Sequence, residues 1–320
     1  MSSSLPQIFY LVSTPRLISK VGTRILTCEP TELYNILQQA TVFPALSDPN
    51  YLLLLDARQT NEYNESHILT SKRAPRTAED KFLVPYGAEI ECKMHVIVLD
   101  NNTTSLSKRE SPAFKCAKVM AEAGSRNPVR ILRGGYEEFS ALYPFLRTQK
   151  ILYMPQEMDE LRPYPVEVLP GHLYLGNYQQ ACSPGVKKDL KIKGVLHISQ
   201  DAEELQEGLV GVELMHCPLP DGNEADMLSQ LSQACQFIGK HVTEKNAILV
   251  SSEHGISRSA AAILAYLMYH YKWTLQKAYK HLQTCKSNIR PHRDFISQLS
   301  KWEEQIFEEG VQTDISDPYY

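Results

Sequence analysis

Apolar residues in the first half of the chain form short uninterrupted runs, and segments of helical spacing separate these runs. The runs YLLLLDAR (51–58) and HVIVLDNN (95–102) are typical of parallel strands that are buried on both faces. Residues 31–40 and 112–123 have the spacing of amphipathic helices, and a further strand and helix follow in 128–146. This alternation predicts a doubly wound α/β domain over residues 28–147.

The second half repeats the α/β pattern after a segment rich in charges and prolines. That segment, 148–164, is predicted to be a linker on the surface. Apolar runs in 166–177, 190–201 and 212–218, a helical pattern over 227–241, and helices up to Phe307 follow. We therefore predict a second α/β domain over residues 165–308 and a tail over 309–320, which ends in TDISDPYY and is expected to be disordered.

Residues 1–27 differ from the rest because they contain no acidic side chain. A helix there would place Arg16, Lys20 and Arg24 on one face, as in a mitochondrial transit peptide. The alternative is a disordered leader. The protein is accordingly expected to be intracellular, in the mitochondrial matrix if the leader is a transit peptide and otherwise in the cytoplasm.

Composition and charge exclude several classes of function. The 320 residues carry a formal net charge of -4, which gives no electrostatic footprint for nucleic acid, and no apolar run is long enough to span a membrane. The seven cysteines are scattered, without CxxC pairs or histidines at metal-ligand spacing. We expect reduced thiols, no metal and no cofactor.

Two separated motifs of the first domain, LLLLDARQTNEYNESHI (52–68) and RILRGGYEEFSALYPFL (130–146), resemble those of rhodanese-like domains. In active sulfurtransferases of that family, the strand corresponding to HVIVLD ends in a catalytic cysteine, and here that position is Asp100. A carboxylate cannot carry a persulfide, so we predict no sulfur transfer. Asp56, Arg58 and His67 are interpreted as structural groups that join the ends of elements.

Rhodanese-like domains also dock kinases in the MAP kinase phosphatases, through a basic cluster flanked by aliphatic residues. The nearest candidate here contains Lys72, Arg73 and Arg76. Pro75 interrupts it and acidic residues follow at once, which favours a solvated loop over a docking site.

Five motifs in order make the second domain resemble a dual-specificity protein phosphatase. They are VEVLPGHLYLGN (166–177), LKIKGVLHIS (190–199), CPLPD (217–221), ISRSAAAILAYLM (256–268) and IRPHRDFISQLSKWE (289–303). Both halves together resemble the MAP kinase phosphatases and an inactive relative of them.

The resemblance assigns roles to the segment SSEHGISRS (251–259). The family loop reads His–Cys–x–x–Gly–x–x–Arg–Ser/Thr, so Ser252 takes the nucleophile position and Ser251 that of the preceding histidine. Asp221 stands at the general-acid position, and Asp226 is a less favoured alternative. The phosphate-binding positions are Glu253, His254, Gly255, Ile256, Ser257, Arg258 and Ser259.

A serine hydroxyl becomes a useful nucleophile only beside a base, and Ser251 cannot serve as one. We therefore predict that the chain is not an enzyme. The predicted function is a regulatory module that binds phosphoproteins, MAP kinase-type kinases or active phosphatases. Two alternatives remain: a very weak phosphatase that uses Ser252 with His254 or Asp221, and a docking scaffold that does not depend on phosphate.

Overall fold

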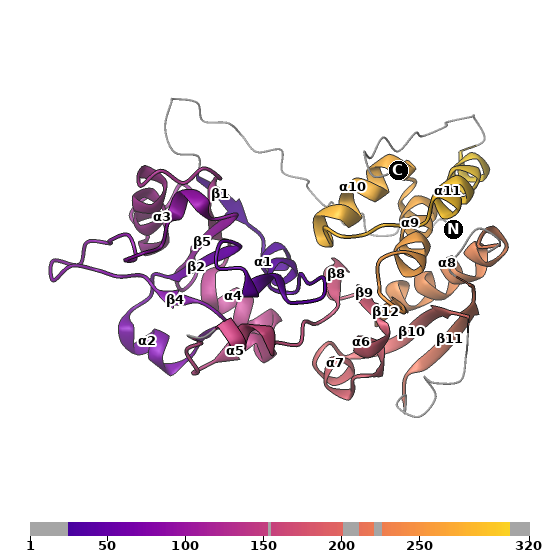
Figure 1. Ribbon diagram of the computed structural model, residues 1–320, viewed down its shortest axis with the longest axis horizontal. Helices are drawn as coiled ribbons and strands as arrows, with labels where there is room; N and C mark the ends of the chain where they lie inside the picture. Colours follow the sequence, from indigo (N-terminus) through magenta and orange to yellow (C-terminus); the bar gives the residue numbers. More distant parts are fainter. Residues whose placement is uncertain (1–24, 153–154, 201–210, 221–225, 308–320) are drawn as a thin grey trace, which may run out of the picture. The chain divides into compact units, whose positions relative to one another are not determined.

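The computed structural model describes residues 25–152, 155–200, 211–220 and 226–307. Its contacts divide the chain into two compact units (Figure 1). The first unit comprises the described residues up to 28 together with 50–142 and 146–151. The second unit comprises 29–49, 143–145 and the described residues from 152 onward. Each unit is a mixed α/β structure, as the sequence predicts.

The first unit is built on a parallel sheet in the order β1-β6-β5-β2-β4. These strands are Ile25–Cys28, Val129–Leu132, His95–Leu99, Leu52–Asp56 and Lys72–Arg73, respectively. Helix α3 (Pro112–Glu122) packs its apolar side on β5, β6 and β1. The remaining elements are α2 (Thr60–Glu65), α4 (Gly135–Leu142) and the antiparallel pair β3 (His67–Ile68) and β7 (Arg147–Thr148).

The ends of two helices follow local sequence rules. The Ser111 hydroxyl accepts a hydrogen bond from the Phe114 N–H at the start of α3, and Pro112 stands at the first helical position. Helix α4 ends at Leu142, four residues earlier than the pattern predicts, and residues 144–146 form a 3₁₀ turn that begins with Pro144. Proline cannot continue an α-helix because it lacks the N–H donor.

Strand β1 is a correction to the predicted leader. Ile25 and Leu26, which the leader helix would have included, are extended and pair with Val129 and Arg130 of β6. The predicted domain boundary at residue 28 therefore lies inside a strand. Residues 1–24, which hold the rest of the leader prediction, lie outside the described residues.

The second unit contains a five-stranded sheet in the order β11-β10-β12-β9-β8, in which only β8 runs antiparallel to its neighbour. These strands are Glu213–Pro218, Ile192–Ser199, Ala247–Ser252, Leu173–Asn177 and Val166–Leu169. Its helices are α1 (Pro30–Leu37), α5 (Pro155–Asp159), α6 (Tyr178–Cys182), α7 (Pro184–Asp189), α8 (Leu228–Thr243), α9 (Arg258–Tyr271), α10 (Leu275–Cys285) and α11 (Arg293–Ile306).

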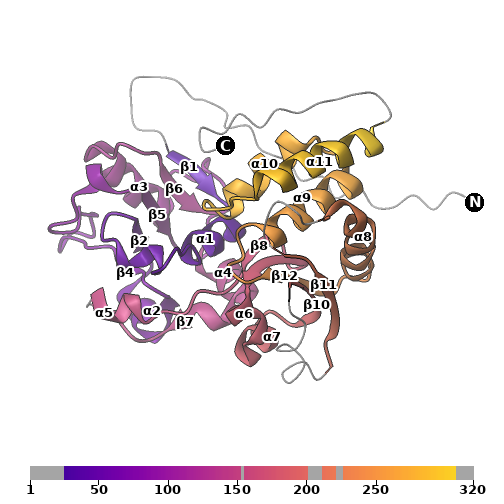
Figure 2. The same ribbon diagram turned by 45° about the vertical axis from the view of Figure 1, so that its right-hand side comes forward.

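Helix α9 lies at the centre of the core of the second unit. Residues 258–268 of this helix are all buried, because α8 and the central strands contact it from one side and α10 and α11 from the other (Figure 2). A helix that is apolar on all sides requires such complete cover. The core therefore holds the N-terminus of α9 firmly against the end of β12.

The division into units differs from the predicted domain boundaries at two places. Residues 29–49 and 143–145, predicted as part of the first domain, lie in the second unit. The predicted linker 148–164 begins at the last residue of β7 and includes the helix α5. Asp221 and the tail 309–320 lie outside the described residues.

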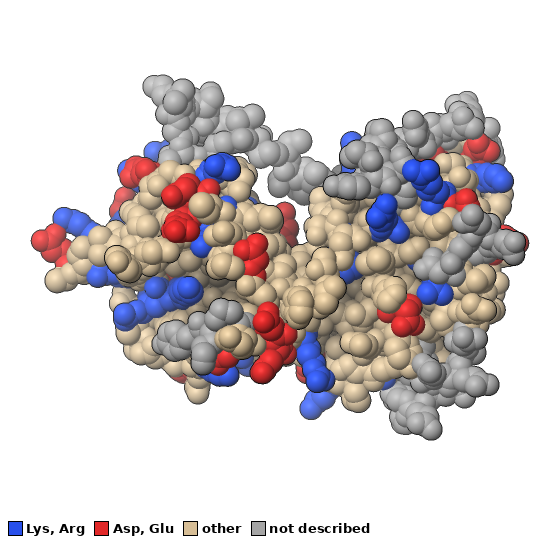
Figure 3. Space-filling view, in the orientation of Figure 1, with Lys and Arg blue, Asp and Glu red and all other residues tan. Residues whose placement is uncertain are grey.

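Among the helices that the structure describes, none is both long and apolar enough to cross a bilayer. On the face shown in Figure 3, basic and acidic side chains are interspersed on the described surface. This distribution agrees with the small net charge of the sequence.

Candidate functional site

The candidate site lies where the central strand β12 turns into helix α9. Strand β12 ends at Ser252, residues 253–257 form the turn, and α9 begins at Arg258. The first N–H groups of a helix have no partner within the helix, and they carry partial positive charge. A turn of this kind is a ready anion-binding site when the chain wraps around it.

Gly255 allows the turn to pass close to a neighbouring strand. Its φ is +68°, in the left-handed region. A Cβ atom at this position would lie only 2.5 Å from the carbonyl oxygen of Gly176, at the end of β9. The sequence therefore needs glycine here for both conformation and space, as its place in the loop motif predicts.

Ser252 is buried at the bottom of the loop and contacts the first turn of α9. Its Oγ lies 2.9 Å from the Ser259 Oγ and accepts a hydrogen bond from the Ser259 N–H at 3.4 Å. Among the described residues, no basic side chain forms a hydrogen bond with the Ser252 hydroxyl. The Ser259 N–H donates toward this position, which suits an oxygen or sulfur atom bearing negative charge.

Ser251 points to the opposite face of the sheet, where it meets a histidine that the sequence did not single out. The His197 Nδ1 lies 3.0 Å from the Ser251 Oγ, and the two residues are register partners on β10 and β12. Burial, with smaller contributions from His216 and Arg258, lowers the pKa of His197 to about 4. The imidazole is therefore neutral at neutral pH. The parallel register of VLHIS beside ILVSS was the signal that could have identified it.

Arg258 lies at the N-terminus of α9 and is 8% exposed. Its Nη1 donates to the carbonyl oxygen of Leu219 at 3.1 Å. Leu219 stands two residues before Asp221, the predicted general acid, which is outside the described residues. Asp226, the alternative acid, accepts a hydrogen bond from the Ser229 N–H and so caps the start of α8.

The remaining loop residues are either exposed or held by backbone contacts. Glu253 and His254 are exposed. The Ile256 carbonyl oxygen accepts from the Arg290 N–H at 2.7 Å, and the Ser257 Oγ accepts from the His292 N–H at 3.2 Å. The segment before α11 thus fixes the second half of the loop.

In the first unit, the residue at the position of the sulfurtransferase cysteine forms local structural hydrogen bonds. The buried Asp100 carboxylate accepts hydrogen bonds from the Thr103 N–H, the Thr103 hydroxyl and the Ala113 N–H. These bonds close the loop after β5 and cap the start of α3. The hydrogen bonds that this carboxylate accepts thus come from the loop after β5 and the start of α3.

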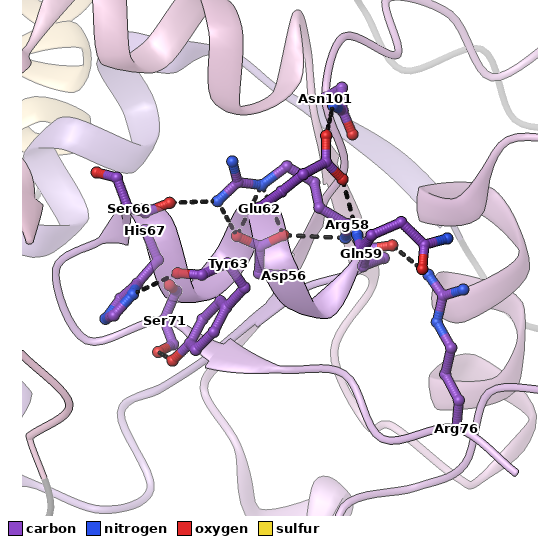
Figure 4. A network of polar contacts seen from close by, with 11 residues as sticks. Asp56, Arg58, Gln59, Glu62, Tyr63, Ser66, His67, Ser71, Arg76 and Asn101 are labelled. Atoms are coloured by element: carbon purple, nitrogen blue, oxygen red, sulfur yellow. Dashed lines mark hydrogen bonds and ion pairs between the residues drawn. The ribbon is translucent and has the colours of Figure 1, made fainter. Parts of the chain in front are cut away.

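A polar network at the ends of β2 and α2 engages the charged residues of the first rhodanese-like motif (Figure 4). The Arg58 guanidinium binds both carboxylate oxygens of Asp56 and the Ser66 carbonyl oxygen. The His67 ring contacts the Tyr63 carbonyl oxygen at 3.0 Å. As predicted, these residues join the ends of elements.

The basic candidate docking cluster is partly engaged in local contacts. Arg76 pairs with Asp80, donates to the Ala57 carbonyl oxygen and lies over the Phe82 ring. Arg73 donates to the Thr60 hydroxyl. These contacts support the interpretation of the cluster as a surface loop.

Comparison with protein families agrees with the architecture of the two units. Residues 173–305 match the dual specificity phosphatase catalytic domain, and residues 30–142 match the rhodanese-like domain. The chain combines a rhodanese-like domain with a dual-specificity-phosphatase-family domain. The predicted fold class is confirmed.

Two human relatives match most of the chain. The dual specificity protein phosphatase 16 of Homo sapiens is 27% identical over 308 residues, which are 89% of this chain and 44% of that protein. The dual specificity protein phosphatase 4 of Homo sapiens is 26% identical over 304 residues, which are 83% of this chain and 76% of that protein. The chain therefore spans less than half of the length of the first relative.

A solved structure also matches part of the chain. It is the human tyrosine phosphatase-like serine/threonine/tyrosine-interacting protein, with 24% sequence identity and a TM-score of 0.40. The match covers 43% of this chain and 95% of that structure.

The prediction that the chain is not an enzyme is wrong on this comparison. The relatives that match it over 83–89% of its length are named dual specificity protein phosphatases. A serine at the nucleophile position does not by itself exclude the class, because serine hydroxyls act as nucleophiles when a neighbouring group activates them.

Proposed function

We propose that the loop from Ser252 to Arg258 recognises phosphorylated segments of other proteins, and that the protein regulates MAP kinase-type signalling by this binding. The observation that carries the proposal is the arrangement at the N-terminus of α9. A buried arginine and the first N–H groups of a buried helix lie around a turn that only glycine can make. Arginine binds phosphate oxygens in bidentate fashion, and the helix N-terminus adds partial positive charge.

The serine at the bottom of the loop supports binding of a doubly charged phosphate. A cysteine thiolate there would carry a negative charge beneath the phosphate, whereas the Ser252 hydroxyl is neutral and accepts from Ser259. Like charges a few ångströms apart repel, most strongly in a partly buried site. The neutral hydroxyl removes this repulsion.

Partners of the proposed function are phosphoproteins, kinases and active phosphatases. The dual-specificity-phosphatase-family domain and its named phosphatase relatives support phosphorylated protein segments as the ligand class. Occupation of such a segment would shield it from other enzymes, because two proteins cannot hold the same phosphate group at once.

Glu253 provides a test at the rim of the loop. Its exposed carboxylate opposes an anion, so Glu253→Gln is expected to tighten binding of inorganic phosphate by roughly two- to fivefold at low salt. Isothermal titration of the full chain would measure the dissociation constant. Glu304→Gln, which neutralises an exposed carboxylate on α11, serves as the control and should leave the constant unchanged. Equal affinities for all three proteins would contradict phosphate binding in this loop.

A further inference from the structure

The helix α1 is an integral part of the second unit, although the rhodanese-like match begins at residue 30. Strand β8 is at the edge of the sheet, and its outer backbone groups need partners. The Asn35 side chain supplies a donor and an acceptor to this edge. Its Nδ2 donates to the Glu167 carbonyl oxygen at 2.8 Å, and its Oδ1 accepts from the Glu167 N–H at 2.7 Å. The Tyr34 hydroxyl donates to the Pro165 carbonyl oxygen beside it.

The buried carboxylate of Glu167 strengthens the contact between α1 and β8. Glu167 is 1% exposed and accepts hydrogen bonds from the hydroxyls of Tyr143 and Tyr174 and from the Gly171 N–H. The Tyr34 and Tyr143 rings stack at 4.5 Å between centroids. A buried charge that is fully hydrogen-bonded fixes the groups around it, because each broken bond would leave the charge unsatisfied.

The chain that follows α1 reaches a second segment of the unit. The Gln39 Nε2 donates to the Cys285 carbonyl oxygen at 2.9 Å, and its Oε1 accepts from the N–H and the hydroxyl of Ser287 at 3.1 Å. The Asn288 Nδ2 donates to the Ala40 carbonyl oxygen at 3.1 Å. Residues 35–40 thus hold both the edge of the sheet and the connection between α10 and α11.

That connection is also the one that contacts the phosphate loop. Its Arg290 N–H donates to Ile256, and its His292 N–H donates to Ser257. Continuous contacts therefore run from Gln39 through Ser287 and Arg290 to the turn before Arg258. Coupling between sites is carried by such packed and hydrogen-bonded segments.

We propose that residues 35–40 are a built-in support for the phosphate loop, and that Gln39 is a positioning residue that sets the affinity of the loop for phosphate. This inference rests on the proposed function. Loss of the support lets the 285–292 connection relax, and the loop then presents its N–H groups to the anion in a less ordered arrangement. Phosphate binding must reorder the loop, so the affinity falls.

The test compares Gln39→Ala with Gln149→Ala in the full-length protein. Gln149 is an exposed glutamine that donates to the Glu65 carbonyl oxygen in the first unit, so its removal is a matched control. We expect Gln39→Ala to raise the dissociation constant for inorganic phosphate by roughly three- to tenfold. Amide hydrogen exchange at Arg290 should also accelerate, while Gln149→Ala changes neither quantity.

Two further variants separate a positioning role from a general loss of structure. Gln39→Glu keeps an oxygen that accepts from Ser287 but places its second oxygen against the Cys285 carbonyl oxygen, so it should weaken phosphate binding as Gln39→Ala does. Asn288→Asp removes the donor to Ala40 and should weaken phosphate binding, as Gln39→Ala does. If the wild type binds phosphate and Gln39→Ala binds it equally well, the proposed supporting role of residues 35–40 is wrong. A wild type that does not bind phosphate would instead overturn the proposed function.

Discussion

The double variant Ser251→His and Ser252→Cys is expected to hydrolyse an aryl phosphate at least about a hundredfold faster than the wild type. This gain is a fraction of the ~10⁶ that a complete nucleophilic unit contributes in hydrolases. A cysteine at 252 would meet the Ser259 N–H, which now donates to Ser252, and would lie beside the Ser259 hydroxyl. Donors and a helix N-terminus lower the pKa of a thiol and make the thiolate available.

The two single variants show which replacement matters. Ser252→Cys alone should give the larger part of the gain, because it supplies the nucleophile without a large ring at the fully buried position 251. Ser251→His alone should give none. Steady-state kinetics with p-nitrophenyl phosphate would measure all three variants. An unchanged rate in both variants that contain cysteine would show that the loop is not arranged for phosphoryl transfer.

Replacement of Arg258 by alanine is expected to weaken phosphate binding by about one to two orders of magnitude. The guanidinium is the one arginine side chain at the N-terminus of α9, and charge-assisted hydrogen bonds contribute about 1.5–3 kcal/mol each. Arg258→Lys keeps the charge but loses the planar pair of donors, so its affinity should lie between those of the wild type and the alanine variant.

Controls for Arg258 address charge and folding. Arg126→Ala removes an exposed positive charge from the first unit and should leave phosphate affinity unchanged. Because Arg258 is buried and donates to Leu219, thermal denaturation of each variant must accompany the titration. A stable Arg258→Ala protein with wild-type phosphate affinity would contradict the role of the loop.

The features of the fold that the sequence predicted depend on local pattern. Runs such as LLLL in β2 are apolar at every position, and only a strand buried on both faces has that requirement. Strand β1 was missed because it has only four residues and follows a basic segment. The place of α1 was missed because helical periodicity shows that one face is buried but does not identify the surface that covers it.

The site also combines features that a local motif predicts with contacts between segments distant in the sequence. Gly255, Arg258 and Ser259 are close in sequence, so a local motif predicts their arrangement. His197 lies 54 residues from its partner Ser251, and only the register of two parallel strands brings them together. The enzyme prediction failed for another reason: it relied on the residue types at positions 251 and 252, whereas the relatives that match most of the chain are named dual specificity protein phosphatases.

The most direct test is a pair of titrations of the full-length protein, one with a phosphotyrosine or phosphothreonine peptide and one with the same peptide without phosphate. Recognition by the loop predicts that the phosphorylated peptide binds at least about tenfold more tightly, because the charge-assisted bonds of Arg258 form only with the phosphate. Inorganic phosphate should compete with it. Equal affinity for the two peptides would contradict the account and would favour a docking scaffold that does not depend on phosphate.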